Sequence, residues 1–217
     1  MACKARTKIN EIEMKIIAVG KNYACHALEF DGTEEKPQNP MIFMKPDSAI
    51  LKNGKHFYMP DFLGQIDYEA EVVVRINQLG KSIPARFARR YYDAVTVGID
   101  FTARQMQREF IAAGAPWELS KGFDGSAVLG EFRPVEQYDI NNLDFSLTID
   151  DETVQSANTS QMLFKVDEVI AYVSRFCTLK TGDLIFTGTP AGVGEARIGT
   201  HLKGYLAGDK VLDFHIR

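Results

Sequence analysis

The sequence predicts a single β-rich domain of the α+β class. Short apolar runs with strand-type residues outnumber the segments with helical spacing, and the two kinds are interspersed along the chain. No repeat, low-complexity tract or linker divides the 217 residues, and mixed folds often exceed about 200 residues as one unit. We therefore expect one catalytic domain over residues 14–217, preceded by a loose polar lead-in of residues 1–13.

Local patterns predict the elements in chain order. Strands are expected at 15–20, 41–45, 66–76, 94–101, 143–149, 152–157, 184–187, 200–206 and 210–216. Helices are expected at 24–30, 84–92, 103–113 and 166–176. Asn53-Gly54 is a strong turn signal and predicts a hairpin over 50–58. Thr102 can cap the third helix and Gly114 can end it.

Charge and cysteine usage exclude several classes of protein. The net charge is -4 without a basic block, so nothing indicates a nucleic-acid or membrane-surface partner. Cys3, Cys25 and Cys177 lie far apart without a pairing pattern, which is typical of a reducing compartment. No apolar run approaches the roughly 20 residues of a membrane helix. We expect a soluble, cytoplasmic protein.

Two acids begin the strand expected at 66–76. Side chains two apart on a strand share a face, so Glu69 and Glu71 should project side by side. Two carboxylates this close repel unless a proton, a base or a cation lies between them. A divalent metal is one explanation and a solvated, acidic end of an edge strand is the other. This stretch alone favours neither.

Asp100 is the best candidate for a third metal ligand, because it ends a buried apolar strand. Three carboxylates without a nearby cysteine favour a hard ion, Mg²⁺ or Mn²⁺, over zinc. The alternative is that Asp100 caps the following helix.

Three loops carry further candidates. The segment 188–194 lacks the Gly-Lys-Ser/Thr of a phosphate-binding loop, and we expect its N–H groups or the Thr189 hydroxyl to contact an anion such as a carboxylate. His26 and Glu29 share one helix face and can form a carboxylate-polarised base, beside a loop at 31–40 that can act as a lid. Lys121, in a loop at 120–126, can balance a substrate oxyanion. A structural histidine and a solvated lysine are the alternatives.

These residues belong to motifs that resemble the fumarylacetoacetate hydrolase family, closest to its short acylpyruvate hydrolases and oxaloacetate decarboxylases. The motifs run in family order from Met14 to the C-terminus: Val19-Gly20-Lys21-Asn22-Tyr23, His26-x-x-Glu29, Phe43-Met44-Lys45-Pro46, Glu69-x-Glu71, Gly98-Ile99-Asp100-Phe101-Thr102-Ala103-Arg104, Pro116-Trp117, Lys121-x-Phe123-Asp124 and Thr187-Gly188-Thr189-Pro190-Ala191-Gly192-Val193-Gly194.

The resemblance implies a mixed β-sandwich roll, a homodimer and a Mg²⁺ or Mn²⁺ ion held by three acids, Glu69, Glu71 and Asp100. It implies that His26 and Glu29 form a catalytic dyad on a lid, with Lys121 as the third catalytic group. The substrate-contacting positions are Lys21, Tyr23, Arg104, Gln107 and Thr189. Lys21 stands where close relatives often have arginine, which keeps the charge but loses the bidentate geometry.

The implied substrate is a small 2-oxo acid that chelates the metal, so that an enolate forms on the ion. The first hypothesis is hydrolysis of a C–C bond in acylpyruvate-like 1,3-diketo acids, with water activated by the dyad. The rivals are oxaloacetate decarboxylation and a ring-opening isomerase or tautomerase of 2-oxo acids, which use the same enolate. A metal- and acid-binding protein without turnover is the non-enzymatic alternative.

Overall fold

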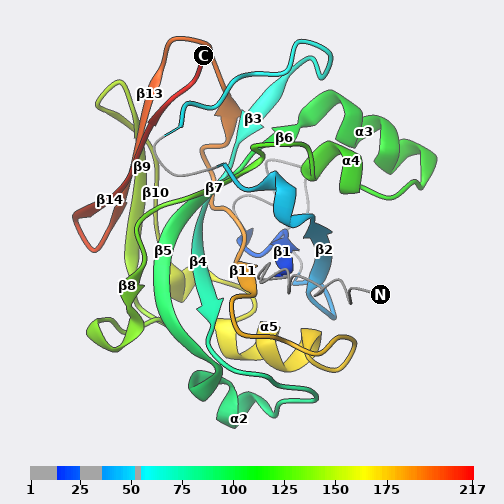
Figure 1. Cartoon of the computed structure of the whole chain (residues 1–217), viewed down its shortest axis with the longest axis vertical. Helices are drawn as coiled ribbons and strands as arrows, with labels where there is room; N and C mark the ends of the chain where they lie inside the picture. Colours follow the sequence, from blue (N-terminus) through cyan, green and yellow to red (C-terminus); the bar gives the residue numbers. More distant parts are fainter. Residues whose placement is uncertain (1–13, 25–35, 52–54) are drawn as a thin grey trace, which may run out of the picture.

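In the computed structural model, residues 14–24, 36–51 and 55–217 are described. Their strands form three sheets with few helices between them (Figure 1). The lead-in 1–13 lies outside the described residues, as do most of the helix expected at 24–30, residues 31–35 of the expected lid and the Asn53-Gly54 turn. Among the described helices, none is long and apolar enough to cross a membrane.

The largest sheet of the described chain has seven strands in the order β2-β1-β11-β4-β5-β7, with β8 paired to β5. These strands are β1 (Ile16–Gly20), β2 (Met41–Lys45), β4 (Ala70–Ile76), β5 (Tyr92–Asp100), β7 (Ala127–Leu129), β8 (Arg133–Pro134) and β11 (Leu184–Phe186). Its two longest strands, β4 and β5, form an antiparallel pair in which the Val72 and Val97 side chains are fully buried. Valine suits this position because a β-branched side chain packs well on a pleated surface.

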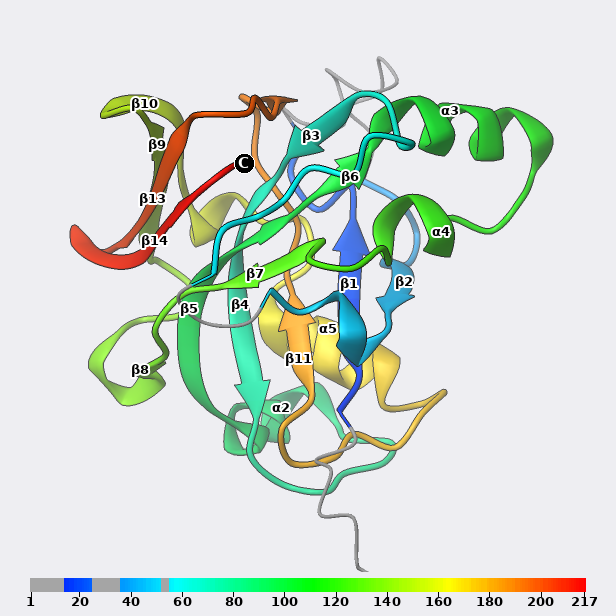
Figure 2. The same cartoon turned by 45° about the horizontal axis from the view of Figure 1, so that its top comes forward.

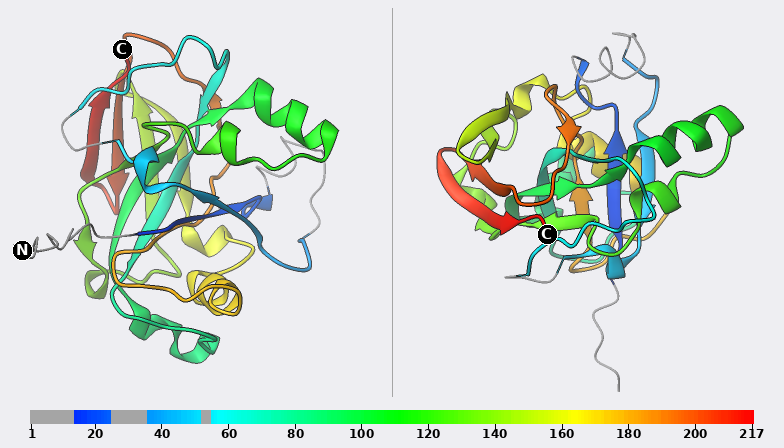
Figure 3. Two further views of the ribbon diagram at one scale, coloured as in Figure 1. Left: turned by 45° about the vertical axis from the view of Figure 1, so that its right-hand side comes forward. Right: turned by 90° about the horizontal axis from the view of Figure 1, so that it is seen from above.

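Two smaller sheets complete the β-structure. One has the order β10-β9-β13-β14 and the other β12-β3-β6. Their bounds are β9 (Asp144–Ile149), β10 (Glu152–Asn158), β13 (His201–Leu206), β14 (Asp209–His215), β3 (Ile66–Tyr68), β6 (Thr102–Ala103) and β12 (Gly194–Glu195). The four-stranded sheet packs against β4 and β5, on the side of the molecule away from α3 and α4 (Figure 3). This arrangement agrees with the predicted mixed, β-rich fold.

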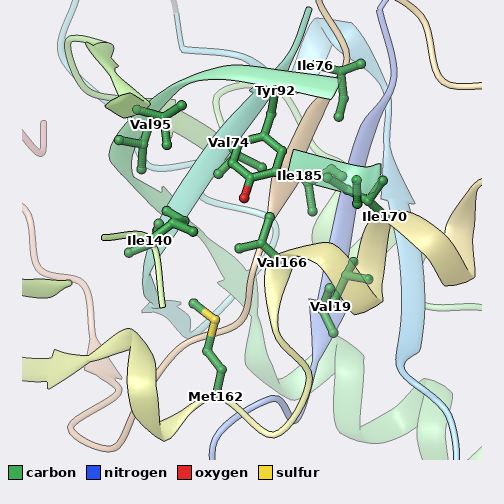
Figure 4. Close-up of a cluster of buried hydrophobic side chains, with 14 of the residues drawn as sticks. Val19, Val74, Ile76, Tyr92, Val95, Ile140, Met162, Val166, Ile170 and Ile185 are labelled. Atoms are coloured by element: carbon green, nitrogen blue, oxygen red, sulfur yellow. The ribbon is translucent and has the colours of Figure 1, made fainter. Parts of the chain in front are cut away.

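One apolar cluster lies between the largest sheet, the four-stranded sheet and α5 (Val166–Val173). Val166 and Ile170 point from α5 towards Val19 and Ile185 of the sheet (Figure 4). The remaining helices are α2 (Ala85–Ala88), α3 (Arg104–Ala113) and α4 (Glu118–Lys121), and the 3₁₀ turns are η1 (Asp47–Ala49), η2 (Arg89–Tyr91), η3 (Val135–Gln137) and η4 (Thr159–Gln161). The predicted helix at 166–176 thus ends at Val173.

Two predictions about local structure are wrong because distant segments take the hydrogen bonds. The flanks of the expected hairpin do not pair with each other: Ile50 bridges to Ala127 and Phe57 bridges to Ile216. Thr102 does not cap α3, since it lies in β6 and pairs with Asp67 of β3. The N-cap position is Ala103, and its side chain makes no capping hydrogen bond. Gly114 ends α3 in the left-handed conformation, as predicted.

The structure differs from two other predictions, and both differences concern the candidate site. The strand expected at 66–76 is interrupted at Glu69, and its two parts, β3 and β4, belong to different sheets. Lys121 does not lie in a loop but is the last residue of the short helix α4, where its side chain is buried.

Candidate active site

Six segments that are distant in sequence meet at one pocket. Two of its lining segments belong to α3 and α4, which lie beside β6 and β3 (Figure 2). The pocket encloses about 380 Å³ of empty space, part of it open to solvent. It is lined by Val19, Gly20, Lys21, Phe43, Glu69, Glu71, Asp100, Arg104, Gln107, Trp117, Lys121 and Thr189. The lining thus combines charged groups with the rings of Phe43 and Trp117, and the Lys121 ammonium lies 5.1 Å from the centre of the Phe43 ring.

The interruption between β3 and β4 brings three acids together. Glu69 lies at the interruption, and its carbonyl accepts the N–H of Asp100, the last residue of β5 (2.9 Å). Glu71 lies one residue into β4 and pairs with Gly98. Each of the three carboxylates places an oxygen within 4.8 Å of the others, and all three residues are buried. The strand register therefore builds the acidic cluster that the spacing predicted.

Lys121 binds two of these acids at once. Its ammonium donates to Glu69 Oε2 at 2.7 Å, to Asp100 Oδ2 at 2.9 Å and to the Thr102 hydroxyl at 2.7 Å. Burial lowers the pKa of Lys121, but the carboxylates of Asp100 and Glu69 more than offset this, so its pKa is raised. Lys121 is therefore a protonated, cationic group at neutral pH rather than a base.

Lys45 is a second buried cation, which belongs to the Phe43–Pro46 motif but was not among the predicted site residues. Its ammonium lies 2.6 Å from Asp100 Oδ1, and it donates to the carbonyl and hydroxyl of Ser126 at 3.1 Å. It also donates to the Lys121 carbonyl, which ties α4 to the same centre. Burial lowers the pKa of Lys45, and the Asp100 carboxylate opposes that change. The signals in the sequence were its place in that motif and its position at the end of an apolar run.

Arg104 orients Glu69. Its guanidinium donates to Glu69 Oε1 at 2.5 Å, to Asp67 Oδ2 at 2.7 Å and to Gln107 Oε1 at 2.7 Å. These hydrogen bonds place Arg104 and Gln107 at the pocket, but they direct the guanidinium of Arg104 towards protein groups. Asp67 was not among the predicted site residues, because its partner is 37 positions away along the chain.

Glu71 differs from the other two acids. It accepts the backbone N–H of Gly188 at 2.6 Å, and none of the described ammonium or guanidinium groups pairs with it. Burial raises the pKa of Glu71 well above its usual value, and the charges of Asp100 and Glu69 raise it further. In the segment 188–194, the backbone N–H of Gly188 thus binds a carboxylate of the protein itself, and contact of this segment with a substrate anion stays a prediction.

The residues present fit a divalent cation. The donors are three converging carboxylates, one of which lacks a cationic partner among the described side chains. Carboxylate oxygens suit Mg²⁺ or Mn²⁺. The alternative in which Asp100 caps a helix is wrong, since Asp100 pairs with Lys45 and Lys121 instead.

The remaining predicted site residues are Lys21, Tyr23, His26 and Glu29, and they do not all lie at the pocket. Lys21 lines the pocket with a backbone φ of 55°, a left-handed conformation unusual for lysine. Tyr23 does not line the pocket but is buried in the main apolar cluster, where its hydroxyl has no hydrogen-bond partner among the described residues. Burial raises the pKa of Tyr23, and Glu71 raises it further. His26 and Glu29 lie outside the described residues.

Comparisons with known proteins find relatives of nearly the whole chain. The family described as fumarylacetoacetate (FAA) hydrolase C-terminal matches residues 15–215. A mitochondrial oxaloacetate tautomerase of Arabidopsis thaliana is 37% identical over 93% of this chain and 90% of its own. A mitochondrial oxaloacetate decarboxylase of Dictyostelium discoideum is 37% identical over 96% of both chains. A fumarylpyruvate hydrolase of Pseudomonas aeruginosa, solved with Mn²⁺ and pyruvate, superposes with a TM-score of 0.87 at 34% identity, covering 93% of this chain and 88% of that one.

Proposed function

The chain belongs to the fumarylacetoacetate hydrolase family of enzymes, and from this premise we propose that its pocket binds a small 2-oxo acid and stabilises the enolate of that acid. The observation that carries the proposal is the contact of Lys121 with Glu69 and Asp100. It places the ammonium group of Lys121 against two of the three carboxylates that can hold a divalent cation.

Glu69, Glu71 and Asp100 would hold the ion. When bound, Mg²⁺ or Mn²⁺ supplies a Lewis acid that lowers the energy of negative charge on the oxygens of the 2-oxo acid. Lys121 adds a positive charge close to the same place, among buried side chains where charge interactions are stronger than in water. Arg104 keeps the Glu69 carboxylate in one orientation, which prepares the site before the substrate arrives.

Tautomerisation of an oxaloacetate-like 2-oxo dicarboxylic acid is the reaction we place first. One proton leaves C3 of the keto acid and one proton is added to the C2 oxygen, so the atoms balance without water or a further reactant. Relatives that bear the name oxaloacetate tautomerase match almost the whole chain. We propose that His26 and Glu29, the dyad expected from the sequence, transfer the C3 proton.

Hydrolysis of a C–C bond in an acylpyruvate-like acid is the second candidate. It is favoured by the similarity to a fumarylpyruvate hydrolase whose structure contains Mn²⁺ and pyruvate. Here the His26–Glu29 dyad would activate water, the water would attack the distal carbonyl, and the bond to C3 would break to give a carboxylic acid and the enolate of pyruvate. Loss of CO₂ from oxaloacetate would give the same enolate, and the Dictyostelium relative is named an oxaloacetate decarboxylase.

A substrate panel with product identification tests the proposal. Purified protein with Mg²⁺ or Mn²⁺ is given oxaloacetate, acetylpyruvate or fumarylpyruvate, and NMR follows the enol and keto forms, released CO₂ and carboxylic acid products. We expect metal-dependent acceleration of the enol–keto exchange of oxaloacetate. Fast release of acetate from acetylpyruvate with slow exchange would favour the hydrolase. Metal-independent rates on all three acids would contradict the proposal. Homodimer formation stays a prediction that sedimentation analysis can test.

A further inference from the structure

Gln155 of β10 has a buried side-chain amide that contacts two segments of the candidate site, the one at Ala70 and the one at Thr189 and Pro190. It is 2% exposed. Its Oε1 accepts the backbone N–H of Ala70 at 2.9 Å, and its Nε2 donates to the Thr189 hydroxyl at 2.9 Å and to the Pro190 carbonyl at 3.1 Å. Neither the sequence patterns nor the family motifs marked this residue.

A β-bulge turns Gln155 towards the site. Thr153 pairs with Thr148 and Gln155 with Leu147, so Val154 is an extra residue in the ladder between β10 and β9. In a regular strand, residues 153 and 155 would share one face. Thr153 is exposed whereas Gln155 is buried, which is the change of direction that a bulge produces.

Gly192 lets the segment 188–194 approach this bulge. A Cβ atom at Gly192 would lie 2.4 Å from the Val154 carbonyl oxygen and 3.2 Å from Cγ of Gln155, and its φ is +93°. Only glycine tolerates both the contact and the backbone conformation. The glycine pattern that first suggested anion binding therefore serves, in part, to place the chain against Gln155.

Gln155, Thr189 and Ala70 form a closed set of hydrogen bonds. Thr189 donates its hydroxyl to the Ala70 carbonyl at 2.9 Å, while Gln155 accepts the N–H of the same residue. Strand β11 ends at Phe186, so beyond that point these two side chains bind the backbone of Ala70. Ala70 is the residue between the acids Glu69 and Glu71.

We propose that Gln155 is a positioning residue that couples the Thr189 side of the pocket to the Glu69–Glu71 metal carboxylates. This inference rests on the proposed function, because it assumes that the carboxylates hold the ion. Ala70 can keep Glu69 and Glu71 aimed at one point only while its own peptide groups are held. Gln155 holds the N–H of Ala70 directly and its carbonyl through Thr189, so loss of the amide should weaken the binding of both Mn²⁺ and pyruvate.

Isothermal titration calorimetry tests the inference without turnover. Mn²⁺ is titrated into wild type and Gln155→Met, and pyruvate is then titrated at saturating Mn²⁺. Methionine keeps the length but removes all three hydrogen bonds. We expect the Mn²⁺ affinity to fall about tenfold, as for other residues that orient metal ligands, together with a weaker pyruvate affinity. Gln137→Met, at an exposed position of η3, is the matched control and should change neither value.

The outcomes separate this inference from the proposed function. A folded Gln155→Met protein with wild-type affinities for Mn²⁺ and pyruvate would overturn the positioning role alone. A wild-type protein that binds no Mn²⁺ would overturn the proposed function and the inference with it. If Gln155→Met does not fold, Gln155→Glu at pH 8 tests the coupling instead. Its carboxylate can still accept the N–H of Ala70 but no longer donates a hydrogen bond to the Thr189 hydroxyl. It should bind Mn²⁺ and lose pyruvate affinity, and unchanged pyruvate affinity would overturn the coupling.

Discussion

The backbone N–H of Gly188 donates a 2.6 Å hydrogen bond to the Glu71 carboxylate, 117 positions away along the chain. It is the contact that holds the acid with no cationic partner among the described side chains. Gly188 can make it because its φ is +96° and because a Cβ atom there would lie 2.7 Å from Cβ of Asn22. The glycine is thus required by both the backbone conformation and the space.

Replacement of Gly188 by alanine should therefore destabilise the protein and weaken metal binding. The backbone conformation alone costs about 2 kcal/mol for a residue with a side chain, and the contact with Asn22 adds to this. Gly199→Ala is the control, since Gly199 has a φ of +95° and no atom within 4 Å of its Cβ position. Urea unfolding should show a larger loss for Gly188→Ala, and equal losses would mean that the contact with Asn22 is unimportant.

Lys121→Met should abolish most activity while the metal still binds. The substitution removes the positive charge next to the reacting oxygens, and loss of one such electrostatic group typically costs about 100-fold or more in rate. Without the ammonium, Glu69 and Asp100 have one cation fewer, so the Mn²⁺ affinity should stay equal or increase. Steady-state kinetics and calorimetry measure the two quantities. Lys203→Met, which removes an exposed pair with Asp151, should leave both unchanged, and full activity of Lys121→Met would exclude a catalytic role.

Lys45→Met should lower stability strongly. The substitution leaves the buried Asp100 carboxylate with Lys121 as its remaining cationic partner, and it removes the hydrogen bonds that Lys45 donates to the carbonyl and hydroxyl of Ser126. Breaking a buried ion pair costs about 3 kcal/mol or more. Chemical denaturation checks the value. Lys210→Met removes an exposed pair with Asp213 and should change stability little; a similarly small change for Lys45→Met would show that the buried pair adds nothing.

Asp213→Asn should flatten the dependence of stability on acid pH. Hydrogen bonds from His201 and Lys210 lower the pKa of Asp213 from 3.8 to about 2. A carboxylate whose pKa is lowered by folding adds stability above its unfolded pKa, and this contribution is lost as the pH falls from about 4 to about 2. Thermal unfolding of wild type and Asp213→Asn across pH 2–5 should converge at the acid end. Asp209→Asn, at the exposed start of β14, is the control, and a constant gap between the wild-type and Asp213→Asn curves would contradict the pKa assignment.

Local patterns were sufficient where an element's neighbours in sequence are also its neighbours in space. The strands expected at 143–149 and 152–157, and those at 200–206 and 210–216, are of this kind, because the two members of each pair are neighbours in sequence and pair with each other. Local patterns gave wrong predictions where a distant segment competes for the same hydrogen bonds. Ile50 and Phe57 flank a strong turn signal, yet each pairs with a segment more than 70 positions away. Thr102 has the residue type of a helix cap, yet its hydroxyl accepts from Lys121.

The sequence by itself determined the chemical types at the site: three acids, a lysine and a glycine segment, in motifs that identify the family. It did so because residue identity and short spacing decide which atoms can bind a hard cation or an oxyanion. Only the tertiary structure decided how these atoms are held. The interruption at Glu69, the Lys45–Asp100 pair and the bulge that turns Gln155 inwards all depend on contacts between distant segments. Such contacts form only when the sheets pack together, and no local pattern in the chain records them.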